Sequence, residues 1–278
     1  MRPALRGARR RGGASGGGAP PEPSAFTPNE PAGFTTFLDH TWNSTLAPSG
    51  WALDERGSDV AFGTGAGTGP ENATSWGLTL RGGQTMGQLA ILERTLPANT
   101  RRVYSAFTMR LAAGWQFHPS GLKVLYPFFT STGRPFSFNI RPTNGNTGGK
   151  FNWTTETFYV SNPGVTNPLS ENQGAADLDV NTWVRMEFLW ENNAAIDAAN
   201  GRVRWWSSVW NGSAYNAPVL RADHPNVVLW HTFTPGPYPG TFGTWQYNLF
   251  YGGGEILVNA DQLMEFNRAY LSTSTTGL

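Results

Sequence analysis

The sequence predicts an all-β fold in which two antiparallel sheets pack face to face, and three observations indicate it. Glycine (34 residues) and proline (20 residues) are abundant, which favours many turns and little helix. From Phe34 onward, short segments rich in β-branched and aromatic residues alternate with Gly, Pro and Asn turns, at the spacing typical of sandwiches. Several of these segments alternate between apolar and polar residues, as strands with one buried face do.

The chain begins with a segment that has no apolar periodicity, "MRPALRGARRRGGASGGGAPPEPSAF". Residues 1–25 carry five arginines, including Arg9, Arg10 and Arg11, and Glu22 is their sole acid. Such a composition is expected to be disordered or extended on its own. No apolar stretch follows the arginines, so no signal peptide is visible. The sequence therefore predicts an arm of residues 1–33, followed by one domain, residues 34–278.

Strands are predicted in order along the domain at residues 75–82, 101–112, 183–192 and 202–210, with a closing strand within 260–274. Segment 183–192, "WVRMEFLWEN", shows the clearest alternation. Its core face is expected to comprise Val184, Met186, Phe188 and Trp190, and its solvated face Arg185, Glu187 and Glu191. In the next strand the two faces are Val203, Trp205 and Val209 against Arg204, Trp206, Ser208 and Trp210.

Composition excludes several classes of function. The chain has no cysteine and four well-separated histidines, so we expect no metal site and no cofactor. Residues 26–278 hold 15 of the 20 basic and 18 of the 19 acidic residues, and this near balance argues against a nucleic-acid ligand. No run of 18 apolar residues occurs, so no transmembrane segment is expected.

Two stretches resemble a known superfamily. The predicted strand, turn and strand ending in "NGRVRWWSSVWNGS" (200–213) look like those of concanavalin A-like lectin/glucanase jelly rolls. The stretch "WQFHPSGLKVLY" (115–126) resembles one in uncharacterised bacterial members. The resemblance covers roughly residues 34–274, and implies a two-sheet antiparallel jelly roll and an extracytoplasmic location. It leaves function open, since this fold hosts lectins, hydrolases, lyases and structural modules.

Two enzyme classes of this superfamily were compared with the residues. A retaining glycosidase needs two carboxyl groups about 5–5.5 Å apart, whereas Glu187 and Glu191 would lie about 13 Å apart on one strand. Gln116-Phe117-His118 is similar to the Gln-x-His motif of alginate lyases. That resemblance implies that Gln116 holds the substrate carboxylate, His118 takes the proton, and Tyr251 or Tyr247 is the acid. The family's Arg-x-Glu-x-Arg and Tyr-x-Lys-Ala-Gly elements are missing, so no catalytic residue is assigned.

The same stretch also has a structural interpretation, and two non-catalytic functions fit the rest of the chain. His118 would bond near its Pro-Ser-Gly turn, and Lys123 would extend to water. A glycan could stack on an aromatic platform, for which the candidates are Trp206, Trp210, Tyr247 and Tyr251. Alternatively, the arm arginines and the loop 231–247, with Tyr238, could dock on acidic partners or lipid head groups.

Because two sequence elements of the alginate lyases are missing, a non-catalytic function is favoured over cleavage of a polysaccharide. We expect a non-catalytic structural subunit of a larger protein assembly, and the sequence leaves open whether that assembly is associated with a membrane. A carbohydrate-binding module and a uronate-polymer lyase are the alternatives.

Overall fold

The computed structural model describes residues 26–42, 48–55, 60–64, 69–70, 75–83, 88–117, 122–129, 136–142, 150–157, 178–229, 240–251 and 259–277. Over these ranges the chain forms strands and turns without a helix, which confirms the all-β prediction. The strands are β1 (Thr35–Thr41), β2 (Ala52–Glu55), β3 (Val60–Thr64), β4 (Trp76–Leu80), β5 (Gln88–Thr95), β6 (Arg102–Leu111), β7 (Leu122–Phe129), β8 (Phe136–Pro142), β9 (Lys150–Thr157), β10 (Leu178–Asp179), β11 (Val184–Glu191), β12 (Gly201–Val209), β13 (Val219–Val227), β14 (Phe242–Tyr251) and β15 (Gln262–Ser274).

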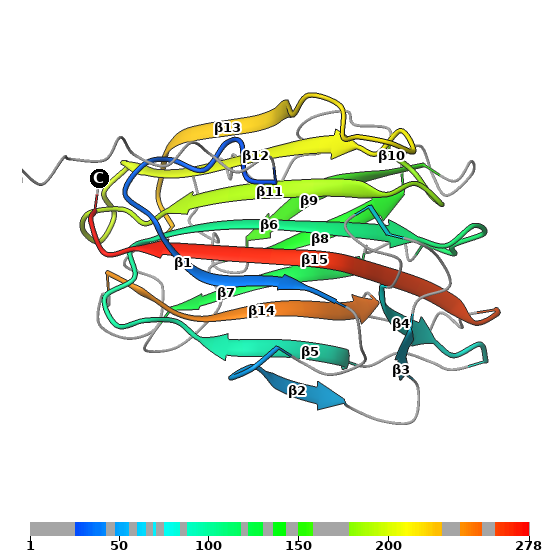
Figure 1. Ribbon diagram of the computed structural model, residues 1–278. Helices are drawn as coiled ribbons and strands as arrows, with labels where there is room; N and C mark the ends of the chain where they lie inside the picture. The colour runs from blue at the N-terminus through cyan, green and yellow to red at the C-terminus, as the bar shows by residue number, and fades with distance from the viewer. Residues whose placement is uncertain are drawn as a thin grey trace, which may run out of the picture.

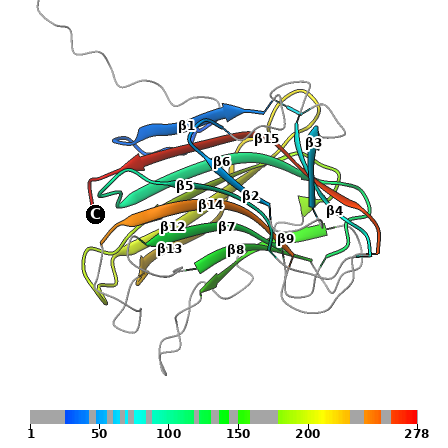
Figure 2. The same cartoon turned by 90° about the horizontal axis from the view of Figure 1, so that it is seen from below.

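These strands make two antiparallel sheets that lie against each other as curved layers (Figures 1 and 2). The eight-stranded sheet has the order β13-β12-β11-β6-β15-β4-β3, with β1 also paired to β15. The seven-stranded sheet has the order β10-β9-β8-β7-β14-β5-β2. Neighbouring strands are mostly far apart in sequence, so the sheets depend on long-range pairing, as the predicted jelly roll requires.

The main core lies between the two sheets. All four residues predicted on the core face of β11 are buried there, at 1% exposure or less: Val184, Met186, Phe188 and Trp190. Trp190 meets Trp245 of the opposite sheet with ring centroids 4.9 Å apart, and Phe188 stacks on Phe107 of β6 at 5.9 Å. Large aromatic rings therefore fill the space between the layers and account for much of the apolar area that the fold buries.

A second apolar cluster lies on the opposite, outer face of the eight-stranded sheet. The N-terminal segment 26–34 crosses this face, in front of β12, β11 and β6 (Figure 1). The members of the cluster are Phe26, Tyr104, Ala106, Leu189, Trp206 and Tyr270, with Phe34 packed against them. Tyr270 also donates a hydrogen bond to Glu30, at 2.9 Å, which ties the segment to β15.

The charged residues of β11 on this face are all buried, so the expectation that Arg185, Glu187 and Glu191 form a solvated face is wrong. Glu187 is fully buried and accepts hydrogen bonds from the Tyr104 hydroxyl (2.5 Å) and from Asn29. Glu191 is 3% exposed and pairs with Arg102 at 2.6 Å. Strand alternation identifies which side chains point away from the first core, but it does not reveal that another segment covers them.

Candidate functional site

The seven-stranded sheet turns one face into the core and the other away from it. On β14, Trp245 and Tyr247 belong to the core, so Gln246 between them occupies the outer face. Gln246 lies opposite Glu93 of β5 and Tyr126 of β7 in the strand register. Directly opposed residues of antiparallel strands share a face. The positions of Glu93, Gln246 and Tyr126 therefore form a row across three adjacent strands.

A second row of polar positions runs beside the first. Lys123 of β7 lies opposite Phe250 of β14 and Asn139 of β8, and Asn139 lies opposite Thr154 of β9. Arg141 follows two residues after Asn139 on β8 and so occupies the same face. The backbone register alone gives these placements. By register these positions adjoin the first row, and their residue types, lysine, asparagine, threonine and arginine, suit a ligand rich in hydroxyl and charged groups.

One contact on this face is described at the level of side chains. Gln246 is 8% exposed and its Nε2 donates a hydrogen bond to Oε2 of the partly exposed Glu93. The carboxylate therefore fixes one N–H of the amide toward β5, and the second N–H of the same nitrogen can donate to a ligand. A fixed amide of this kind can recognise a ligand without first losing side-chain freedom.

Gln116 lies elsewhere. It belongs to the irregular segment after β6, and β7 begins only at Leu122, so Gln116 is not part of a strand. Its backbone N–H donates to Oε1 of Gln262, and its own Oε1 accepts from the Asn259 N–H at 2.9 Å. With these residues it lines a cavity of about 260 Å³. Gln116 therefore joins two connecting segments, and His118 lies outside the described residues.

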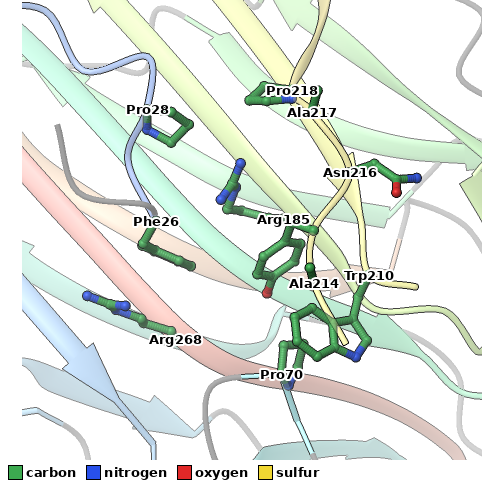
Figure 3. A pocket seen from close by; sticks show the side chains of 11 residues that line it. Phe26, Pro28, Pro70, Arg185, Trp210, Ala214, Asn216, Ala217, Pro218 and Arg268 are labelled. Atoms are coloured by element: carbon green, nitrogen blue, oxygen red, sulfur yellow. The ribbon is translucent and has the colours of Figure 1, made fainter. Parts of the chain in front are cut away.

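The aromatic residues expected to share one platform are separated by the fold. Tyr247 lies in the core beside Ser105, with 3.1 Å between their hydroxyl oxygens, and burial raises its pKa well above the usual value. Trp206 lies in the second cluster with Phe26, at 8% exposure. Trp210 is half-buried and lines a cavity on the outer face of the eight-stranded sheet (Figure 3). Trp206 and Trp210 therefore lie on the eight-stranded sheet and Tyr247 on the seven-stranded one, which the alternation within each strand could not show.

The remaining predicted residues lie in two groups. Lys123 and Tyr251 have described backbones, in β7 and at the end of β14 respectively. Outside the described residues lie Arg9, Arg10, Arg11, His118 and Tyr238. Among the residues that are described, no three His, Cys, Asp or Glu side chains gather into a possible metal site. The same part of the chain contains no helix of the length and apolarity needed to cross a membrane.

The sequence reasoning missed the row through Gln246. A signal was present in the segment "TWQYNLF", where Thr244, Gln246 and Asn248 alternate with large apolar residues. Glu93 had no such signal, because only the pairing of β5 with β14, strands 153 residues apart at this contact, brings it beside Gln246.

Comparisons with known proteins give matches of structure alone. No protein family profile and no curated protein sequence matches the chain. A mutant of alginate lyase Aly36B, solved with an alginate trisaccharide, matches with a TM-score of 0.54 and 12% identity, over 84% of this chain and 96% of that one. Another mutant of that enzyme, with an alginate tetrasaccharide, gives 0.51 and 12%, over 84% and 95%. An endo-β-1,4-glucuronan lyase from the fungus Trichoderma reesei gives 0.52 and 11%, over 86% and 96%. At these identities the likeness is one of fold.

Proposed function

We propose that this chain, a jelly roll of the concanavalin A-like superfamily that includes polysaccharide lyases, binds a uronate polymer across the outer face of its seven-stranded sheet. The observation that carries the proposal is the pair of polar rows on that face, one through Glu93, Gln246 and Tyr126 and one through Lys123 and Asn139. The structures that share the fold support it, since their names describe enzymes acting on alginate and glucuronan, both uronate polymers.

The residue types of the rows match the chemistry of such a polymer. Each uronate residue offers one carboxylate and several hydroxyl groups. A lysine amine or a guanidinium suits the carboxylate, and amide and hydroxyl groups suit the hydroxyls. Adjacent strands are about 4.8 Å apart, so a row across three strands provides several points of contact along a sugar chain. Such repeated contacts favour an extended polymer over a single sugar.

Cleavage by β-elimination is the reaction that this set of residues supports best. The reaction needs a group that neutralises the carboxylate, a base and an acid. We assign the first role to the Gln246 amide and the other two to Lys123 and Tyr126 of β7, the strand beside Gln246, where a register shift between the two residues offsets their odd spacing. The base removes the C5 proton, the C–H electrons form the C4–C5 double bond, the C4–O bond breaks, and the acid protonates the departing oxygen.

The test uses two glutamines as a matched pair. Wild-type protein, Gln246→Ala and Gln116→Ala are compared for retardation in gels containing alginate or glucuronan, and for release of unsaturated uronate measured by absorbance. We expect Gln246→Ala to lose binding and turnover and Gln116→Ala to retain both, with melting temperatures confirming that each variant is folded. Lys123→Ala and Tyr126→Phe are expected to abolish turnover while the polymer is still bound.

Two results would count against the proposal. Binding that depends on Gln116 and not on Gln246 would move the site to the Gln-x-His segment. A wild-type protein that neither binds nor cleaves any uronate polymer would return the structural-subunit hypothesis to first place. That hypothesis, and the extracytoplasmic location, stay predictions, since Arg9, Arg10, Arg11 and Tyr238 lie outside the described residues.

A further inference from the structure

A cavity of about 540 Å³ opens on the outer face of the eight-stranded sheet, the face that lies away from the seven-stranded sheet. Figure 3 shows its walls, which come from the N-terminal segment, β11, β15, the turn between β12 and β13, and Pro70 before β4. The lining residues that matter here are Phe26, Arg185, Trp210, Tyr215, Asn216 and Arg268. The cavity shares none of these with the polar rows of the seven-stranded sheet.

One end of the cavity is a rigid aromatic turn. Trp210 and Tyr215 pair as an isolated bridge, and their rings meet edge to face with centroids 5.1 Å apart. The backbone N–H of Trp210 donates to the Trp183 carbonyl at 2.9 Å. The side-chain oxygen of Asn211 accepts three hydrogen bonds, two from Ser213 and one from Ala214, each at 3.0 Å. The indole is thus held in place before a ligand arrives, which lowers the entropy lost on binding.

Two guanidinium groups line the floor of the cavity, and each forms an ion pair with a carboxylate that lies outside the lining. Arg185 stacks over Tyr215 at 4.7 Å from the ring centroid, and Arg268 stacks over Phe26 at 4.2 Å. Their carboxylate partners, Glu187 and Asp39, are not part of the lining. The Arg185 side chain is 3% exposed and the Arg268 side chain 19%, so a ligand in the cavity meets aromatic rings together with the guanidinium of Arg268.

From this combination we propose that the cavity binds a uronate residue of a polysaccharide, with the sugar ring against Trp210 and the carboxylate toward the guanidinium of Arg268. Sugar rings present C–H faces that stack on aromatic rings, and guanidinium groups recognise carboxylates. The choice of polymer rests on the function proposed above. The cavity is a second contact for that polymer, on the opposite side of the molecule from the polar rows.

Two sites on opposite faces have a consequence that depends on the length of the ligand. A long polymer can contact both, and the second contact is then intramolecular, which raises the overall affinity. An oligosaccharide of a few sugars occupies one site at a time. Loss of the cavity site is therefore expected to weaken binding of the polymer and to leave turnover of short oligosaccharides unchanged.

The experiment compares wild-type protein with Trp210→Ala, Asn216→Asp and Leu220→Ala. Trp210→Ala removes the aromatic surface. Asn216→Asp adds a carboxylate at the exposed rim with almost no change of shape. Leu220→Ala is the control, because Leu220 is 49% exposed and close in sequence to the lining without being part of it. Each protein is run in gels containing polyglucuronate, alginate or a neutral glucan of similar length, and is tested for turnover of a uronate trisaccharide.

We expect Trp210→Ala and Asn216→Asp to bind the uronate polymers about tenfold more weakly, with Leu220→Ala and trisaccharide turnover unchanged. Wild-type-like binding of the uronate polymers by both cavity variants, or no binding by the wild type, would overturn the proposal. So would an Asn216→Asp variant in which binding of the neutral glucan falls as much as binding of the uronate polymers. The Trp210→Ala result is used only if the melting temperature of this variant equals that of the wild type. If it does not, the Asn216→Asp result alone tests the proposal. Cavity-dependent binding without any effect of Gln246→Ala would refute the sheet-face function alone.

Discussion

Replacing Glu187 by alanine tests whether the N-terminal segment truly seals the outer face of β11. In the structure this carboxylate is fully buried, accepts hydrogen bonds from Tyr104 and from two nitrogens of Asn29, and lies 3.2 Å from Nε of Arg185 as an ion pair. The Arg185 side chain is itself only 3% exposed. Glu187→Ala therefore leaves a buried guanidinium without this carboxylate and removes the group that holds Asn29.

The size of the effect follows from burial. Removing one partner of a buried ion pair costs about 3–5 kcal/mol, whereas exposed pairs contribute about 0–1 kcal/mol. Because Glu187 also accepts three hydrogen bonds, we expect Glu187→Ala to fall within the higher range. In a chain of this size that corresponds to a fall in melting temperature of roughly 6–20 °C. Glu187→Gln, which keeps the shape and part of the hydrogen bonding, should lose less.

The assay is urea unfolding followed by tryptophan fluorescence, with thermal melting as a second measurement. The control is Arg81→Ala, because Arg81 forms an ion pair with Asp261 in which both side chains are about half exposed (47% and 54%). Arg81→Ala should change stability far less than Glu187→Ala. Equal and small losses from the two variants would refute the burial of Glu187 and restore the solvated face that strand alternation suggested.

Four further results are expected. Deleting residues 1–25 should leave the melting temperature almost unchanged. Deleting residues 1–34 should lower it clearly, because Phe26, Asn29 and Glu30 contact the sheet. Equal melting temperatures of the two truncated proteins would contradict this. Burial lowers the pKa of His40 below its ordinary 6.5, with a smaller opposing effect of Asp39. The unfolded chain therefore takes up the proton first, and the free energy of unfolding should decline as pH falls through 6.5. His40→Gln should make this decline shallower, with His224 contributing the remainder, and a pH profile identical to that of the wild type would argue against it. In an absorbance titration, at least two of the eight tyrosines should ionise only on unfolding, because burial raises the pKa of Tyr104 and Tyr247, and the Glu187 carboxylate raises that of Tyr104 further. Gly201→Ala should destabilise the protein by about 1–3 kcal/mol, measured by urea unfolding, because the new Cβ would lie 2.8 Å from the Val227 carbonyl oxygen.

The sequence predicted the features of the fold that depend on local patterns of residues. Alternation within residues 183–192 identified the core face of β11, including Trp190, and alternation within 202–210 separated the two faces of β12. The turn-rich composition identified the fold class. These features are local, because neighbouring side chains on a strand must point to opposite faces. The same reasoning could not identify which side chains meet across strands.

Pairing between distant segments decided the rest. Glu187 is buried by Asn29, 158 residues earlier, and Glu93 reaches Gln246 across 153 residues. Trp206 lies on β12 and Tyr247 on β14, and these two strands belong to different sheets, although the two residues have similar surroundings in the sequence. Contacts of this separation leave no periodic trace, and so the polar rows and the cavity at Trp210 became visible only in three dimensions.

The position of the last strand constrains how the protein can be made. β15 (red in Figure 1) lies inside its sheet, between β6 and β4, and also pairs with β1 (blue). While a ribosome is still synthesising residues 262–274, the edges of β1, β4 and β6 that β15 will join remain exposed, which favours aggregation over folding. A chain cut shortly before Gln262 would leave three strands without their shared neighbour. Completion of the sheet therefore waits for β15, which is synthesised after all the strands that it joins.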